Sequence, residues 1–103
     1  MDTILNSVRK AAAKKILYLP HAIIQMSRPD RMISSDEIEA IIWNGEVIED
    51  YPEDNRGHSC LMLGSVERAI HVVCAPKQEY LAVITAYIPD KASWSSDFKR
   101  RVV

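Results

Sequence analysis

Several features that mark common classes of protein are missing from this 103-residue sequence. Its three glycines form neither a glycine-rich phosphate loop nor a nucleophile elbow, which gives no support to nucleotide hydrolases or α/β-hydrolases. The longest apolar run, Leu81–Ile88, contains Thr85 and is far shorter than the roughly 18–20 residues of a membrane-spanning helix. The N-terminal stretch contains Asp2 and several lysines where a secretory signal peptide would have an apolar core. We therefore expect a cytoplasmic protein without a membrane partner.

Cysteine is also scarce, and the histidines are scattered. Cys60 and Cys74 do not belong to a Cys-x-x-Cys motif, and both lie in strand-like stretches. We expect small buried hydrophobic residues rather than a disulfide. The three histidines, His21, His58 and His71, show no local ligand spacing. Neither a metal site nor another cofactor is predicted.

The net charge of −1 hides a strong segregation of charge along the chain. Eight of the fourteen acidic residues lie between Asp36 and Asp54, a stretch without lysine or arginine. Basic residues cluster near the two ends of the sequence: Arg9, Lys10, Lys14 and Lys15, then Lys99, Arg100 and Arg101. The two basic clusters form either one basic surface or separate solvated helix faces and a tail. The acidic stretch suits a basic protein partner.

The first third of the chain is predicted to be mainly helical. Apolar residues recur at helical spacing from Ile4 to Ala12, so we expect an N-terminal helix within residues 1–15. Ile16–Leu19 is a short apolar run before Pro20 and predicts a brief strand. His21–Ser27 then predicts a short helix, with Pro20 in its first turn. The whole chain, 1–103, is predicted to form a single domain.

A capping box predicts the start of the next helix, because Ser34 can be its N-cap and Glu37 lies three residues later. Gly45 would end this helix in the left-handed conformation. The closing segment Trp94–Arg101 predicts a short helix, with Ser93 as its N-cap. Four strand candidates lie between these helices, and their short links imply antiparallel neighbours. They are Glu46–Tyr51, Ser59–Val66, Ala69–Ala75 and Tyr80–Ile88. The sequence thus predicts one α+β domain.

Several motifs occur in an order that indicates a family. They include His21-Ala22 with Met26 five residues on, Asn44-Gly45-Glu46-Val47-Ile48-Glu49-Asp50-Tyr51-Pro52, His71-Val72-Val73, Thr85-Ala86-Tyr87-Ile88-Pro89-Asp90 and Asp97-Phe98-Lys99. Over about residues 16–101 they resemble the bacterial domain-of-unknown-function family 4258. That family is similar to RelE/ParE-type toxins. The resemblance implies a RelE-like fold: an antiparallel sheet of four to five strands, N-terminal helices packed on one face, and a short C-terminal helix.

The same resemblance implies a function. Family members often accompany small zinc-finger antitoxins of the kind paired with motility quorum-sensing regulator toxins. We therefore predict the toxin of a bacterial toxin–antitoxin system that cleaves mRNA without a metal ion. The resemblance implies as partners an antitoxin of the zinc-finger type and mRNA or the ribosome.

Metal-free RNA cleavage needs a group that takes the 2′-hydroxyl proton and a group that protonates the leaving oxygen. His21 opens a helix directly after a strand, and His71 lies in a presumed central strand. Each is suited to acid–base chemistry, or is an ordinary packing or capping histidine. Tyr87 shares a strand face with Thr85 and either contacts RNA or packs in the sheet. His21, His71 and Tyr87 are thus the candidate catalytic residues.

The candidate RNA-binding residues are Lys99, Arg100, Arg101, Thr85 and His58. The three basic residues either contact phosphate or form a solvated tail. His58 follows a proline-containing turn, from which it either reaches RNA or stays in solvent.

The alternative function is a non-catalytic binding module of the same fold that holds a partner protein. The near-neutral charge favours it, as does Gln25, which stands where the family often has arginine.

Overall fold

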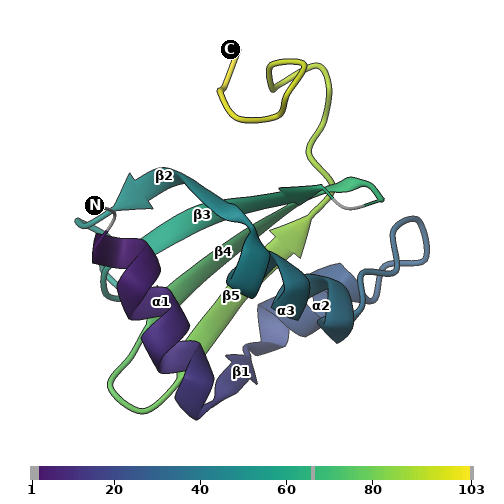
Figure 1. Cartoon of the computed structure of the whole chain (residues 1–103). Helices are drawn as coiled ribbons and strands as arrows, with labels where there is room; N and C mark the ends of the chain where they lie inside the picture. Colours follow the sequence, from purple (N-terminus) through teal and green to yellow (C-terminus); the bar gives the residue numbers. More distant parts are fainter. Residues whose placement is uncertain (1–2, 66, 103) are drawn as a thin grey trace.

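The strands of the protein form one mixed sheet (Figure 1). The computed structural model describes residues 3–65 and 67–102. In chain order its elements are α1 (Thr3–Lys14), β1 (Ile16–Tyr18), α2 (Pro20–Met26), α3 (Ser35–Asn44), β2 (Glu46–Tyr51), β3 (Ser59–Ser65), β4 (Ala69–Pro76) and β5 (Leu81–Tyr87). The strand order across the sheet is β1-β5-β4-β3-β2. The α+β class and these eight predicted elements are confirmed, while Val66 lies outside the described residues.

The prediction of a purely antiparallel sheet is wrong for one pair of strands. β2, β3, β4 and β5 form an antiparallel meander, but β1 runs parallel to β5, with Ile16 opposite Leu81. Parallel neighbours need a long crossover connection, and the chain between Tyr18 and Leu81 provides one. The argument from short links fails here because β1 and β5 are not sequence neighbours.

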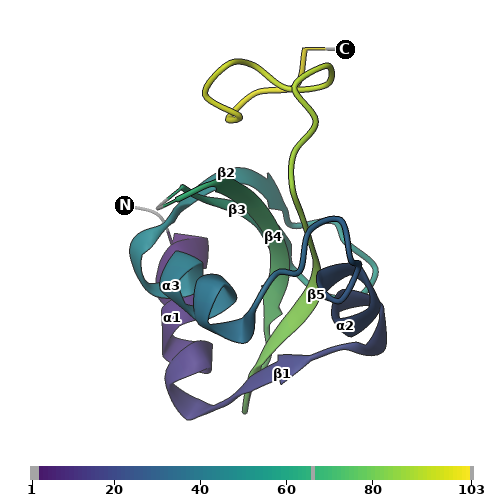
Figure 2. The same cartoon turned by 90° about the vertical axis from the view of Figure 1, so that its right-hand side faces the viewer.

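We expected the N-terminal helices to pack on one face of the sheet, but the helices do not all share a face. Figure 2 shows α1 and α3 in the hollow of the curved sheet, whereas α2 lies on the other side of β5. α2 follows β1 after the single residue Leu19 and buries Ala22 and Met26. Its position beside β5 is therefore fixed by the edge strand before it. None of the helices in the described ranges is long and apolar enough to cross a membrane.

Both ends of α3 depend on particular residues. The predicted capping box is present: Ser34 Oγ accepts a hydrogen bond from the Glu37 amide (3.1 Å), and Glu37 Oε1 accepts one from the Ser34 amide (3.0 Å). Gly45 does end the helix, but its φ of −82° is not left-handed. Glycine is needed there because a Cβ would lie 2.6 Å from the carbonyl oxygens of Ile41 and Leu63.

The predicted C-terminal helix is also wrong. Residues 89–102, the C-terminal segment, form turns and a single bridge between Trp94 and Arg101. Side chains take the amide hydrogens that a helix would use: Asp97 Oδ1 accepts from the Lys99 amide (3.1 Å), and Ser95 Oγ from the Arg100 amide (3.1 Å). Such local bonds compete with helix formation. Ser93 therefore caps no helix.

The two cysteines are buried, as predicted. Cys60 on β3 and Cys74 on β4 are register partners, and their Sγ atoms lie 4.0 Å apart, joined by a hydrogen bond and not by a disulfide. The hydrogen bond to Cys60 and burial both raise the pKa of the Cys74 thiol. Both residues belong to the hydrophobic core, which also includes buried residues of all three helices.

Candidate functional site

A connected group of ionisable and aromatic side chains lies beneath the C-terminal segment. On β4, Val72 and Cys74 belong to the core under α1 and α3, so the alternation of a strand directs His71 to the opposite face. There it meets residues from β2, β5 and the C-terminal segment. We call this group the His71 cluster; its members are Glu49, Tyr51, His71, Tyr87, Trp94 and Arg101.

The His71 imidazole is fully buried, and both of its nitrogens have partners. Nε2 lies 2.8 Å from the Phe98 carbonyl oxygen, and Nδ1 lies 3.2 Å from the Tyr87 hydroxyl. A carbonyl oxygen only accepts, so Nε2 carries the hydrogen and the Tyr87 hydroxyl donates to Nδ1 in the neutral ring. Burial lowers the pKa of His71 and raises the pKa of Tyr87. Both groups are therefore held in their neutral forms.

A bidentate ion pair joins β2 to the C-terminal segment. Arg101 Nε lies 3.0 Å from Glu49 Oε2, and Arg101 Nη2 lies 3.1 Å from Oε1. The Tyr51 hydroxyl also donates to Glu49. Burial acts to raise the pKa of Glu49, but the hydrogen bonds from Arg101 and Tyr51 outweigh it and lower the pKa. Burial and the bond to Glu49 raise the pKa of Tyr51 to about 12.

Trp94 connects the ion pair to the imidazole. The Arg101 guanidinium lies 4.7 Å from the centre of the Trp94 ring, in cation–π geometry. The Trp94 ring meets the His71 ring edge-on, with 4.4 Å between ring centres. The C-terminal segment therefore has two roles: it contributes the Arg101 cation and it covers His71 with Trp94 and Phe98.

The structure brings together three of the residues that the sequence singles out: His71, Tyr87 and Arg101. His21 is exposed on α2, and among the described residues no hydrogen bond or ion pair connects it to the cluster. His58 is exposed beside Asp50. The other three predicted RNA-binding residues are Lys99, which pairs with Glu46 (3.2 Å), Arg100, which is exposed, and Thr85, which is half-buried on β5.

Sequence reasoning missed Glu49, Tyr51 and Trp94 as site residues. The alternation of β2 could have placed Glu49 and Tyr51 on one face. Their acidic surroundings instead suggested a surface for a basic protein partner. Pairing with Arg101 neutralises Glu49, and no local pattern reveals that contact.

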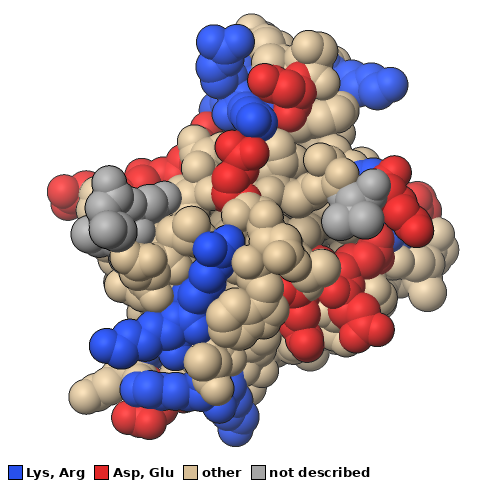
Figure 3. Space-filling model, viewed as in Figure 1, with Lys and Arg blue, Asp and Glu red and all other residues tan. Residues whose placement is uncertain are grey.

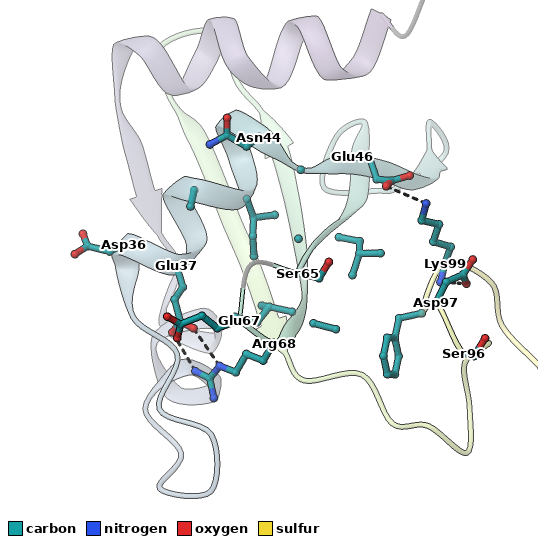
Figure 4. A pocket seen from close by; sticks show the side chains of 18 residues that line it. Asp36, Glu37, Asn44, Glu46, Ser65, Glu67, Arg68, Ser96, Asp97 and Lys99 are labelled. Atoms are coloured by element: carbon teal, nitrogen blue, oxygen red, sulfur yellow. Dashed lines mark hydrogen bonds and ion pairs between the residues drawn. The ribbon is translucent and has the colours of Figure 1, made fainter.

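A second feature is a hollow of about 950 Å³ between α3, the β3–β4 hairpin and the C-terminal segment (Figure 4). We call it the acidic groove. Its described lining includes five acidic residues, Asp36, Glu37, Glu46, Glu67 and Asp97, and two basic ones, Arg68 and Lys99. Arg68 donates to both Glu37 carboxylate oxygens (3.0 Å each), and Lys99 pairs with Glu46. The groove therefore keeps an excess of negative charge.

Charge is segregated in space as well as along the chain. In Figure 3, Lys and Arg gather over α1, whereas Asp and Glu gather over α3. Two bases from the ends of the sequence reach the acidic side. Arg9 of α1 donates to the carbonyl oxygens of Ile42 and Gly45, and Lys99 pairs with Glu46.

A comparison with known protein families gives a match that covers most of the helices and strands described above. The model of the domain of unknown function DUF4258 matches residues 18–88, which is more than half of the chain. The chain belongs to the DUF4258 family. The match runs from the last residue of β1 through β5 and so includes Glu49, His71 and Tyr87, while Trp94 and Arg101 follow it. Neither the curated proteins nor the solved structures include a significant match.

The stability of this DUF4258 domain should fall as the pH drops below 6.5, the ordinary pKa of histidine. Folding lowers the pKa of His71, so in this range the unfolded chain binds more protons than the folded one. The loss is at most about 1.4 kcal/mol per pH unit and stops below the folded-state pKa. Urea unfolding between about pH 7.5 and 5.5 measures it. His71→Gln should flatten the profile; an unchanged profile would assign the proton uptake to another group.

Proposed function

We propose that this DUF4258 domain is the toxin of a bacterial toxin–antitoxin pair, has a RelE-like fold, and cleaves mRNA in the cytoplasm without a metal ion. The observation that carries the proposal is the His71 cluster. It joins an imidazole, a phenol, a carboxylate and a guanidinium through direct contacts. These are the groups that proton transfer and phosphate stabilisation require.

Each group has a role that its environment favours. The neutral His71 imidazole takes the proton of the 2′-hydroxyl while that oxygen attacks phosphorus and forms a 2′,3′-cyclic phosphate. The Tyr87 hydroxyl gives its proton to the leaving 5′-oxygen as the P–O5′ bond breaks. The imidazolium of His71 then returns its proton to Tyr87 through their hydrogen bond. Glu49 holds the Arg101 guanidinium, which stabilises the charge on the phosphorane.

RNA can reach His71 only if the C-terminal segment moves, because Trp94 and Phe98 cover the imidazole. The movement would break the hydrogen bond between His71 Nε2–H and the Phe98 carbonyl oxygen. The neutral ring can then carry its hydrogen on Nδ1, facing the Tyr87 hydroxyl oxygen, so that the Nε2 lone pair takes the 2′-hydroxyl proton. The resting domain is thus closed, and the binding of RNA or of the ribosome would open it.

Induction of the domain alone in a bacterial host tests the proposal. We expect growth arrest, loss of mRNA, and RNA fragments that end in 2′,3′-cyclic phosphate. Co-expression of a neighbouring gene that encodes an antitoxin, of the zinc-finger type with paired Cys-x-x-Cys motifs, should relieve the arrest. Soluble, folded protein that leaves both growth and mRNA unchanged would contradict the assignment.

A second candidate function is favoured by the acidic groove: a non-catalytic module that holds a basic partner protein. Asp36 and Glu67 line the groove, are exposed, and take part in no ion pair among the described residues. In this case the purified product of the adjacent gene should bind without any loss of RNA, and Asp36→Lys with Glu67→Lys should weaken binding. Binding that is insensitive to this charge reversal would remove the groove from consideration.

A further inference from the structure

A smaller hollow of about 440 Å³ lies between α1, the β2–β3 loop and the β4–β5 link. Its polar lining includes Lys10 and Lys14 from α1, His58 from the loop, and Lys77 from the link. We call it the lysine pocket. Among the described residues that line it there is no carboxylate, in contrast to the five of the acidic groove.

Two of the lysines are positioned by backbone carbonyl groups. Lys14 Nζ donates to the Gln78 carbonyl oxygen (2.8 Å), and Lys77 Nζ donates to that of Arg56. Each ammonium has three donors, so two remain for a ligand. Gly57 leaves room for Lys77, since a Cβ at Gly57 would lie 2.7 Å from Nζ. The fold thus fixes positive charge at the rim of the pocket.

This positive charge is not neutralised within the protein. Among the described residues Lys10, Lys14 and Lys77 take part in no ion pair, whereas Lys99 and Arg101 pair with Glu46 and Glu49. Figure 3 shows Lys and Arg gathered over α1, the helix that carries Lys10 and Lys14. An anion would therefore meet three uncompensated lysines together here, whereas Lys99 and Arg101 of the C-terminal segment are already paired with carboxylates.

The shape of the lysine pocket points to the class of ligand. Ile4 and Ala11, both buried, and Pro76 form an apolar part of its lining. Its volume falls within the range of about 300–1,000 Å³ of small-ligand sites, which is enough for a phosphate with its attached nucleoside. We propose that the lysine pocket binds one nucleotide unit of single-stranded RNA, with Lys10, Lys14 and Lys77 on its phosphate. The choice of RNA rests on the proposed function.

Binding of an RNA that cannot be cleaved tests this proposal separately from catalysis. The probe is a single strand of about eight nucleotides with methylated 2′-oxygens. Lys10→Gln and Lys14→Gln should each weaken its binding about tenfold, the cost of a hydrogen bond to a charged group. Each should also reduce the slope of log K against log salt concentration by about 0.7. Lys91→Gln is the matched control, because Lys91 is exposed in the C-terminal segment outside the pocket.

The outcomes separate the alternatives. Equal weakening by Lys91→Gln and Lys10→Gln would show diffuse attraction and overturn the proposal, as would failure of the wild type to bind the strand. If uridine monophosphate binds as tightly as the strand, with the same dependence on Lys10 and Lys14, the pocket takes a free nucleotide and the assignment to RNA is wrong. Lysine-dependent binding of the methylated strand, without cleavage of unmodified RNA, would support the pocket and remove the proposed ribonuclease.

Discussion

Replacement of His71 with glutamine is expected to lower the rate of RNA cleavage by about 10²–10⁴-fold, the usual contribution of a positioned acid or base. A glutamine amide can still donate to the Phe98 carbonyl oxygen and accept from the Tyr87 hydroxyl, so the fold should survive. It cannot take up a proton at neutral pH. Initial rates on an RNA oligonucleotide with purified protein, together with growth after induction, measure the effect.

The control for this variant is His21→Gln, which removes the exposed histidine of α2. Sequence alone made His21 a candidate for acid–base chemistry, but among the described residues no hydrogen bond or ion pair joins its side chain to the His71 cluster. We expect His21→Gln to keep the wild-type rate and the growth arrest. If His21→Gln is inactive and His71→Gln is active, the chemistry belongs on α2 and the proposed site is wrong.

The second large effect concerns the contact between Gly64 on β3 and Ile41 on α3. A Cβ at Gly64 would lie 2.3 Å from Ile41 Cγ1, so Gly64→Ala should destabilise the fold by about 2–3 kcal/mol through overpacking. Ile41→Ala alone should cost about 2–5 kcal/mol because it leaves a cavity. In the double variant the new methyl group occupies part of that cavity. The two losses should therefore fall short of additivity by at least about 1 kcal/mol.

Urea unfolding of the four proteins in this cycle measures the coupling free energy. The matched control uses Ile38→Ala in place of Ile41→Ala, because Ile38 is also a buried isoleucine of α3. Ile38 is not among the nearest neighbours of a Cβ at Gly64, so its combination with Gly64→Ala should be additive. Additivity in the Ile41 cycle would mean that α3 shifts away from β3 instead of compressing the contact.

Predictions from the sequence were most accurate where the decisive interactions are local. The capping box of α3 needs only Ser34 and Glu37, and the strand β2 follows from its own alternation and the glycine before it. The C-terminal segment also depends on local bonds, but from the sequence only Ser93 was considered, as the N-cap of a helix. The side chains of Ser95 and Asp97 instead accept the amide hydrogens and compete with that helix.

The candidate site was harder to predict because it depends on contacts between distant residues. His71 and Tyr87 were identified as individual residues, but their pairing comes from the register of β4 and β5. From the sequence, Arg101 was interpreted as an unpaired cation, because the residues next to it along the chain give no sign of a partner. The fold places Glu49, from the distant strand β2, beside it. The charges of Lys99 and Arg101, which look available in the sequence, are thus compensated by carboxylates in the structure, whereas Lys10 and Lys14 on α1 take part in no ion pair among the described residues.

The parallel pairing of β1 with β5 also governs when the sheet can be completed during protein synthesis. β2 to β5 can pair one after another, because each new strand lies beside the strand made just before it. β1 is made early, yet its only neighbour in the sheet is the last strand to be made. Until the ribosome has passed Tyr87, the backbone of β1 has no native strand to pair with. The edge that α2 and β1 form is therefore the last part of the sheet to close.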